Sequence, residues 1–294
     1  MAIKWIVTDM DGTLLNDRDE ISENTIEALI NCQQRGIKLI LASGRSWSRL
    51  MPYVEQLRMK EYGGSLIEVN GMALNHLNGE RRIFGRLQKN DIQALFLYFQ
   101  TFDAEIQGYL DEQLFYWIPP SLIPFKMQER KERNLPEDYP WTGGAWSWVS
   151  DSRGGYPRQT RIESAEEFPA ELNKISCLAT PETIRRIQKT LKERFGNRYE
   201  FTRTCPRLIE AAPAGITKGQ TLRRYMEAEG ILPDEILVLG DGENDIDMFR
   251  QAKYSIAMGN AEDFVKEAAF DVTDTNCRDG ALCALKKYLP HLLH

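Results

Sequence analysis

Two aspartates stand two residues apart near the start of the chain, where a run of apolar residues ends. Asp9 and Asp11 follow the run from Ile3 to Val7, and Gly12-Thr13 after them is typical of a tight turn. Side chains at positions i and i+2 of an extended segment share a face, so we expect the two carboxylates to converge. Carboxylates that converge repel each other unless a cation or a proton lies between them. Mg²⁺ fits such a pair because it prefers oxygen ligands and usually binds beside a phosphate, whereas the alternative is a solvated acidic turn.

Three further segments carry residue types that suit phosphate chemistry. They are Ser43-Gly44-Arg45, Thr217-Lys218-Gly219 and the stretch from Gly240 to Asp245. Each segment alone is more often a turn or a solvated helix residue. Their order along the chain, together with the Asp9 segment, favours a site for phosphoryl transfer.

The chemistry of phosphate ester hydrolysis assigns a role to each of these residues. Asp9 is the expected nucleophile, and Asp11 is the expected general acid and base. The metal ligands are expected to be Asp9, Asp11, Asp241 and Asp245. The groups expected to bind the phosphoryl oxygens are Ser43, Gly44, Lys218 and Asn244. Arg45 and Asn70 are candidates for contact with the substrate, with an ion pair that bridges two domains as the alternative for Arg45.

The elements that must position these residues follow a strand and helix rhythm. Apolar runs at 3–7, 37–42, 65–69 and 236–239 read as buried strands, and Ser22 and Thr217 read as N-caps of helices. Near-continuous apolar strands that alternate with helices predict a Rossmann-like, doubly wound parallel sheet in an α/β fold. Since ligands bind beyond the carboxyl ends of such strands, we expect the candidate residues to share one crevice.

The middle of the chain differs from both ends in its composition and in its pattern of strands and helices, and this predicts an inserted α+β domain. A hairpin is expected around Asn78-Gly79, and we place the insertion at residues 85–206, within a core made of 1–84 and 207–294. The stretch from Trp117 to Arg161 is rich in proline, glycine, tryptophan and basic residues. Its tryptophans and basic residues either hold a sugar ring and an anionic group or simply pack and face solvent, and packing is the favoured interpretation. These residues are Trp117, Lys126, Arg130, Trp141, Trp146, Trp148, Arg153, Arg158 and Arg161.

Composition narrows the class of protein. The 294 residues carry a net charge of -6, which argues against a nucleic-acid binder, and no apolar run is long enough to span a membrane. The N-terminal residues lead directly into a strand, so we expect no signal peptide. The five cysteines lack metal-type spacing and are expected to be reduced thiols of a cytoplasmic protein. With only three histidines, catalysis centred on histidine is improbable.

Taken in order, the four segments resemble those of the haloacid dehalogenase superfamily, in its Cof-type subfamily IIB of phosphatases. The resemblance extends to Val69-Asn70-Gly71, to the stretch from Ile256 to Ala261 and to Asp279-Gly280. It implies a phosphatase core with a C2-type cap between Asn70 and Lys218, which closes over the core and determines specificity. It also implies that the backbone carbonyl of Asp11 reaches the metal.

The main hypothesis is therefore a Mg²⁺-dependent phosphatase that acts on a small phosphorylated metabolite, most plausibly a sugar phosphate, through an aspartyl phosphate. One alternative is a phosphomutase on the same scaffold, which a bisphosphate requirement would reveal. Another is a non-enzymatic relative that binds a ligand under its cap. The presence of Asp9, Asp11, Lys218 and Asp241 argues against it, because binding alone does not need the carboxylates of both Asp9 and Asp11. The sequence leaves the oligomeric state open.

Overall fold

The computed structural model describes residues 3–144 and 147–292. The chain divides into two compact units, one formed by Met1–Phe84 with Ile216–His294 and the other by Gly85–Gly215. The second unit is thus an insertion into the first. The expected end of the insertion at residue 206 falls before strand β13 (Leu208–Pro213), which pairs with strands of the second unit.

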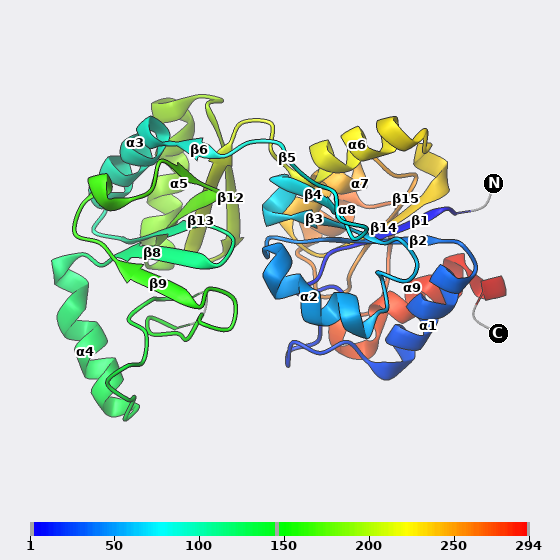
Figure 1. The fold of residues 1–294 in the computed structure, drawn as a ribbon, viewed down its shortest axis with the longest axis horizontal. Helices are drawn as coiled ribbons and strands as arrows, with labels where there is room; N and C mark the ends of the chain where they lie inside the picture. The colour runs from blue at the N-terminus through cyan, green and yellow to red at the C-terminus, as the bar shows by residue number, and fades with distance from the viewer. Residues whose placement is uncertain (1–2, 145–146, 293–294) are drawn as a thin grey trace. The chain divides into compact units, whose positions relative to one another are not determined.

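The first unit is built on an eight-stranded sheet with the order β16-β15-β14-β1-β2-β3-β4-β5 (Figure 1). The six strands from β16 to β3 are parallel, and β4 and β5 form an antiparallel hairpin at the edge. Their bounds are β1 Trp5–Thr8, β2 Lys38–Ala42, β3 Ser65–Glu68, β4 Ala73–His76, β5 Arg81–Ile83, β14 Ile236–Gly240, β15 Tyr254–Ala257 and β16 Asp271–Val272. The parallel sheet and the hairpin confirm the expected α/β architecture.

Helices cover both faces of this sheet because its strands are apolar on both sides. One face packs against α1 (Glu23–Gln34), α2 (Trp47–Gln56) and α9 (Gly280–Tyr288). The other face packs against α6 (Lys218–Glu229), α7 (Ile246–Phe249) and α8 (Asp263–Ala268). In β1, Ile6 faces the first group while Trp5 and Val7 face the second, as the alternation of side chains along a strand requires. The sheet is therefore doubly wound, and Figure 1 shows α6 and α7 on the side opposite α1 and α9.

The second unit is an α+β domain with a six-stranded sheet in the order β12-β13-β11-β7-β8-β9. All neighbouring strands are antiparallel except β8 and β9. The remaining bounds are β7 Glu105–Tyr109, β8 Gln113–Trp117, β9 Arg158–Arg161, β11 Lys174–Leu178, β12 Tyr199–Cys205 and the short pair β6 Leu87–Gln88 with β10 Glu171–Leu172. Helices α3 (Lys89–Gln100) and α5 (Pro181–Phe195) bury the apolar face of the sheet, and α4 spans Ile123–Glu132.

The tryptophan-rich stretch of the second unit packs mainly on itself. Lys126 is fully buried, forms an ion pair with Glu105 and donates to the carbonyl of Trp141. Arg130 donates to four backbone carbonyls between 136 and 140 and lies 4.5 Å from the Trp141 ring centroid. Arg158 and Arg161 are exposed, and Trp146 lies outside the described residues. For Lys126 and Arg130, the contacts are those of packing rather than of a ligand site.

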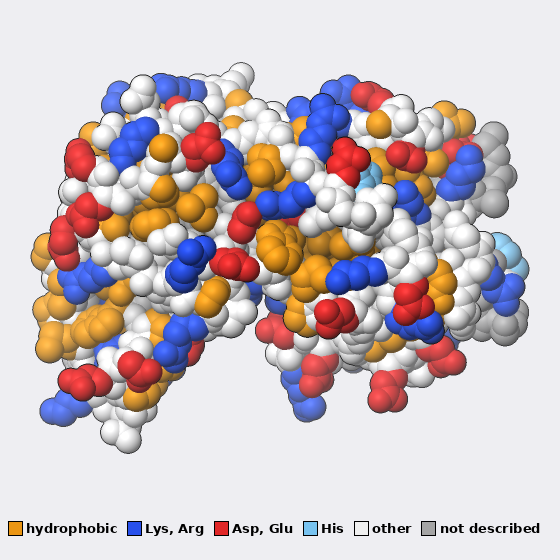
Figure 2. Space-filling view, in the orientation of Figure 1, with side chains coloured by type: hydrophobic (Ala, Val, Ile, Leu, Met, Phe, Trp, Pro, Cys, Tyr) orange, Lys and Arg blue, Asp and Glu red, His pale blue; other side chains and the backbone are white. Residues whose placement is uncertain are grey.

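The surface carries both signs of charge, and the described helices are too short or too polar to span a membrane. On the face shown in Figure 2, acidic and basic side chains are interspersed over each unit rather than segregated. Within the described part of the chain, no helix has the length and apolar character needed to cross a membrane.

Candidate active site

The residues singled out by the sequence come together at one edge of the first unit's sheet. Asp9 follows β1, Ser43 follows β2, Asn70 follows β3 and Asp241 follows β14. These four strands are neighbours and run in parallel, so their carboxyl ends meet at the same edge. The expected shared location of these side chains is therefore confirmed by the topology.

Asp9 and Lys218 form the centre of the site. The Nζ of Lys218 lies 2.5 Å from Oδ1 of Asp9 and 2.8 Å from Oδ1 of Asp245. All three residues are buried, and Lys218 is only 1% exposed. Thr217 caps α6 by accepting the amide of Gln220, which sets Lys218 at the first helical position. Helix capping and strand ending thus bring together two residues that are 209 positions apart.

Asp241 reaches the same site from β14 and is held by the turn that follows Asp9. The hydroxyl of Thr13 donates to Oδ1 of Asp241 over 2.7 Å. Gly12 precedes Thr13 with a φ of +80°, and a Cβ at this position would lie 2.3 Å from Oδ2 of Asp241. A side chain at residue 12 would therefore displace the Asp241 carboxylate, so the turn requires glycine both for conformation and for space.

The acidic residues of the site offer a donor set that suits a hard divalent cation. One carboxylate oxygen from each of Asp9, Asp241 and Asp245 lies within 4.8 Å of the others. Oδ1 of Asp245 accepts from Lys218, and its Oδ2 accepts the backbone amides of Asp241 and Gly242 at 3.0 Å. Both oxygens of Asp245 already accept hydrogen bonds, so within this cluster Asp9 and Asp241 are better placed to bind a cation directly.

The carboxylate of Asp11 does not converge with that of Asp9 in the way the spacing predicts. It accepts two hydrogen bonds from the guanidinium of Arg45, one of them 2.8 Å long from Nε. Arg45 also contacts Asp19 at 2.9 Å and the hydroxyl of Tyr53 at 3.2 Å. All of these partners belong to the first unit. An arginine 34 positions away thus turns Asp11 aside. The observed ion pairs of Arg45 lie within the first unit, whereas the alternative interpretation of Arg45 has it bridge the two units.

The remaining polar residues of the site lie in the segments after β2, β3 and β14. Oδ1 of Asn70 accepts from Nδ2 of Asn244 at 3.0 Å and lies 3.3 Å from the place a Cβ on Gly44 would take. Ser43 is fully buried, and its hydroxyl accepts the amide of Arg45. Ser43, Gly44, Asn70 and Asn244 are therefore neighbours.

The backbone that presents Asn70 is strained. Val69 has a φ of 47° and Asn70 a φ of 54°, and a β-branched residue rarely adopts the left-handed region. The amide of Val69 donates to the carbonyl of Arg45, and that of Asn70 donates to the carbonyl of Ser43. Strain held by such contacts is found at functional sites, where it aims a side chain. Here it turns Asn70 towards Asn244.

Burial and neighbouring negative charge raise the pKa of Asp9 and Asp241, whereas Arg45 lowers the pKa of Asp11. Burial raises the pKa of Asp9 well above its usual value, Lys218 opposes this, and Asp245 and Asp241 add to it. Burial and the charge of Asp245 raise the pKa of Asp241 to about 7. For Asp11, burial alone would raise the pKa, but the hydrogen bonds and charge of Arg45 hold it below its usual value. The pKa values of Asp9 and Asp11 are therefore shifted in opposite directions from the ordinary value of an aspartate.

These shifts predict how stability depends on pH once divalent cations are chelated. Asp241 has a pKa of about 7 when folded against 3.8 as its ordinary value, so the folded chain binds more protons between these limits. We expect the unfolding midpoint in EDTA to fall as pH rises from about 4 to about 7, and Asp9 acts in the same direction. Thermal unfolding at pH 5 and pH 8, with EDTA or Mg²⁺, measures this. Mg²⁺ should raise the midpoint more at pH 8, and Asp241→Asn should flatten the EDTA curve; a midpoint independent of pH would contradict the assignment.

Thr13 is a residue of the site that sequence reasoning treated only as part of a turn. Its hydroxyl links the turn after Asp9 to Asp241, which is 228 positions away in the sequence. The sequence contains one indication of this role, which is that a hydroxyl residue directly follows the glycine of the turn. Its partner could not be inferred because nothing local links β1 to β14.

The chain matches the family model described as haloacid dehalogenase-like hydrolase over residues 6–285. It is 26% identical to the 5-amino-6-(5-phospho-D-ribitylamino)uracil phosphatase YcsE of Bacillus subtilis, over 98% of this chain and 96% of that protein. It is also 26% identical to the chloroplastic endoribonuclease YBEY of Arabidopsis thaliana, where the match covers 97% of this chain. This chain spans about half of that longer protein, 46% of its length.

Among solved structures, a haloacid dehalogenase-like hydrolase from Bacteroides thetaiotaomicron superposes with a TM-score of 0.75. It is 28% identical to this chain, and the alignment covers 97% of this chain and 99% of the other. The similarity therefore includes the inserted unit as well as the doubly wound one.

Proposed function

The chain belongs to the haloacid dehalogenase-like hydrolases and is a phosphatase of their Cof-type branch, and from that premise we propose that it hydrolyses a small phosphorylated metabolite with Mg²⁺, through an aspartyl phosphate on Asp9. The observation that carries the proposal is the buried contact of Asp9 with Lys218, beside Asp241 and Asp245. A buried carboxylate held against a cationic side chain is suited to attack a phosphorus atom whose oxygens need charge neutralisation.

In the proposed reaction, one oxygen of Asp9 attacks the phosphoryl group and the leaving oxygen departs on the opposite side. Lys218 lies beside the nucleophile and offsets the charge of the equatorial oxygens. Asp9 and Asp241 would hold Mg²⁺, which supplies further charge neutralisation and favours the ionised forms of both carboxylates. The amide of Gly44 and the side chains of Ser43 and Asn244 would donate hydrogen bonds to the phosphoryl oxygens.

Asp11 would serve as the acid in the first step and as the base in the second. Arg45 holds the pKa of Asp11 below its usual value, against the raising effect of burial, so Asp11 is ionised while this contact persists. An ionised Asp11 is suited to take a proton from the water that hydrolyses the aspartyl phosphate. To protonate the leaving oxygen, the carboxylate must first leave Arg45 and take up a proton from solvent, to which its side chain is 56% exposed.

We propose that the second unit, Gly85–Gly215, selects the leaving group. The side chains gathered at the sheet edge of the first unit suit a phosphate and a cation, which every substrate of a phosphatase shares. The related enzyme YcsE is named for an ester with a phosphorylated ribityl chain, so a phosphorylated polyol or sugar is the substrate class to test first.

The direct test is phosphate release from a panel of sugar phosphates, sugar alcohol phosphates, nucleotides and phosphoglycerate esters. We expect turnover in Mg²⁺ and none in EDTA, with one ester class preferred by at least about tenfold in kcat/KM. Turnover of none of these esters by the wild-type protein would contradict the proposal. Activity that appears only with a bisphosphate activator would identify a phosphomutase instead.

A further inference from the structure

The turn that follows Asp9 has an unusual arrangement of backbone hydrogen bonds. The amides of Thr13, Leu14 and Leu15 all donate to the single carbonyl of Met10, at 3.3, 3.0 and 2.9 Å. The carbonyls of Gly12 and Leu15 accept side-chain donors instead. This turn carries Asp11 on one side and, through Thr13, holds Asp241 on the other. Its position therefore affects two of the groups assigned to phosphoryl transfer.

Two asparagines from the far end of the chain bind those carbonyls. Nδ2 of Asn260 donates to the carbonyl of Gly12 at 2.8 Å, and Nδ2 of Asn276 donates to the carbonyl of Leu15 at 2.9 Å. The two residues are linked, since the backbone amide of Asn276 donates to Oδ1 of Asn260 at 2.9 Å. Asn260 lies in the loop after β15 and Asn276 in the loop after β16. The pair thus connects the turn to the sheet edge.

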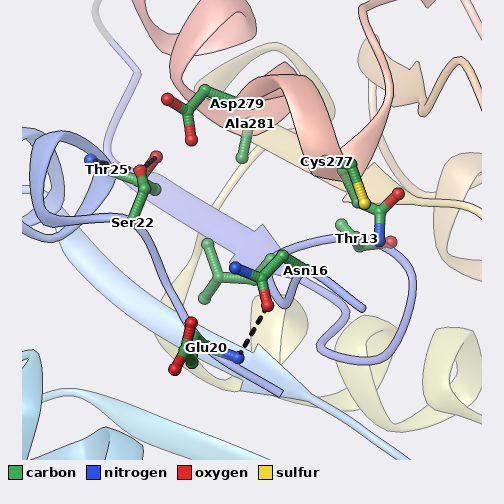
Figure 3. A pocket seen from close by; sticks show the side chains of 10 residues that line it. Thr13, Asn16, Glu20, Ser22, Thr25, Cys277, Asp279 and Ala281 are labelled. Carbon is green, nitrogen blue, oxygen red and sulfur yellow. Dashed lines mark hydrogen bonds between the residues drawn. The ribbon is translucent and has the colours of Figure 1, made fainter. Parts of the chain in front are cut away.

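Packing cannot replace these bonds on the side of the turn that faces Asn276. A polar pocket of about 240 Å³ lies there, between the turn and the first residues of α1 and α9 (Figure 3). Its lining includes Thr13, Asn16, Ser22, Asn276 and Asp279. A cavity of this size and polarity holds water rather than close-packed side chains. Directional hydrogen bonds therefore fix the turn where apolar contacts do not.

We propose that Asn260 and Asn276 are positioning residues for phosphoryl transfer, which act by fixing the turn and, through Thr13, the carboxylate of Asp241. This inference rests on the proposed function. Neither asparagine touches the reacting atoms, so each acts through another residue. Positioning groups of this kind change metal affinity or activity by about 10- to 100-fold when removed.

The test compares Asn260→Ala and Asn276→Ala with Asn24→Ala, an exposed asparagine of the same unit. We expect each of the first two to lower kcat by about 10- to 100-fold with KM changed less than about twofold. In the absence of substrate, the Mg²⁺ concentration that gives half of the thermal shift should rise about tenfold, because Asp241 is no longer held. The Asn24 variant should match the wild type in both measurements.

A double-mutant cycle with Thr13→Val tests the route. If the asparagines act through Thr13, then Asn276→Ala should weaken Mg²⁺ binding much less in the Thr13→Val background than in the wild type. Additive losses would overturn the route, and variants that match the Asn24 control would overturn the proposal. The thermal-shift arm needs no substrate, so it remains decisive even if the phosphatase assignment fails. If Asn276→Ala did not fold, Asn260→Ala, whose side chain is exposed, would carry the same test.

Discussion

Asp9→Asn should lower the rate of phosphate release at least about 10³-fold, because an amide cannot form the aspartyl phosphate. The protein is expected to stay folded. The asparagine Oδ1 can still accept from Lys218, and Lys218 keeps its bond to Asp245. The substitution also removes one of the two carboxylates, those of Asp9 and Asp241, whose charged form is destabilised by burial and by neighbouring negative charge. We therefore expect the free energy of unfolding in EDTA to change by no more than about 1 kcal/mol.

Steady-state phosphate release and urea unfolding of the purified variant measure the two effects. Asp17→Asn, at an exposed aspartate of the same segment, is the matched control and should keep full activity. The thermal shift produced by Mg²⁺ should be smaller in Asp9→Asn, since one proposed ligand has lost its charge. A variant that retains more than about a tenth of the activity would rule out Asp9 as the nucleophile.

Lys218→Met should produce the largest loss of stability of any single change in the site. Burial alone would lower the pKa of Lys218, but Asp245 and Asp9 raise it, so the ammonium is firmly charged. Without it, Asp9, Asp241 and Asp245 share a buried space with no internal cation. Breaking a buried ion pair by removal of one partner costs about 3–5 kcal/mol. Activity should also fall by at least about 10²-fold, because the charge beside the phosphoryl group is lost.

Urea unfolding at pH 8 in EDTA measures this loss, with Lys60→Met at an exposed lysine as the control. The deficit should shrink in Mg²⁺, which supplies the missing positive charge, and at pH 5, where protonation relieves the repulsion. Equal deficits under all three conditions would show that Lys218 contributes packing rather than charge.

The parts of this protein that follow from local pattern were predictable from its sequence. Apolar runs fixed the strands, and the position of Ser43, Asn70 and Asp241 just after them placed these residues at one edge of the sheet. Ser22 and Thr217 cap α1 and α6 as expected, since an N-cap depends on residues only two or three positions away. Helix α2 was not predicted because Pro52 interrupts its pattern.

The features that depend on distant partners were not predictable in the same way. The spacing of Asp9 and Asp11 suggested convergence, but Arg45 captures the carboxylate of Asp11. The bond from Thr13 to Asp241 and the positive φ of Val69 are likewise set by tertiary contacts. In the second unit, β9 joins the sheet alongside β8 from across the tryptophan-rich stretch, and no periodicity marks that pairing. Local sequence determines which elements form, while long-range contacts determine where their side chains point.

The pairing of β1 with β14 has a consequence for how the protein is made. Trp5 lies opposite Ile236, so the central pair of the sheet joins two strands that are separated in the sequence by the whole inserted unit. A ribosome releases the whole of Gly85–Gly215, with its own apolar core, before it reaches β14. We therefore expect the inserted unit to fold first during synthesis, while β1 waits with an unpaired edge. Asp9 meets Asp241 only after β14 has been made, so a chain that stops before residue 236 cannot assemble the site.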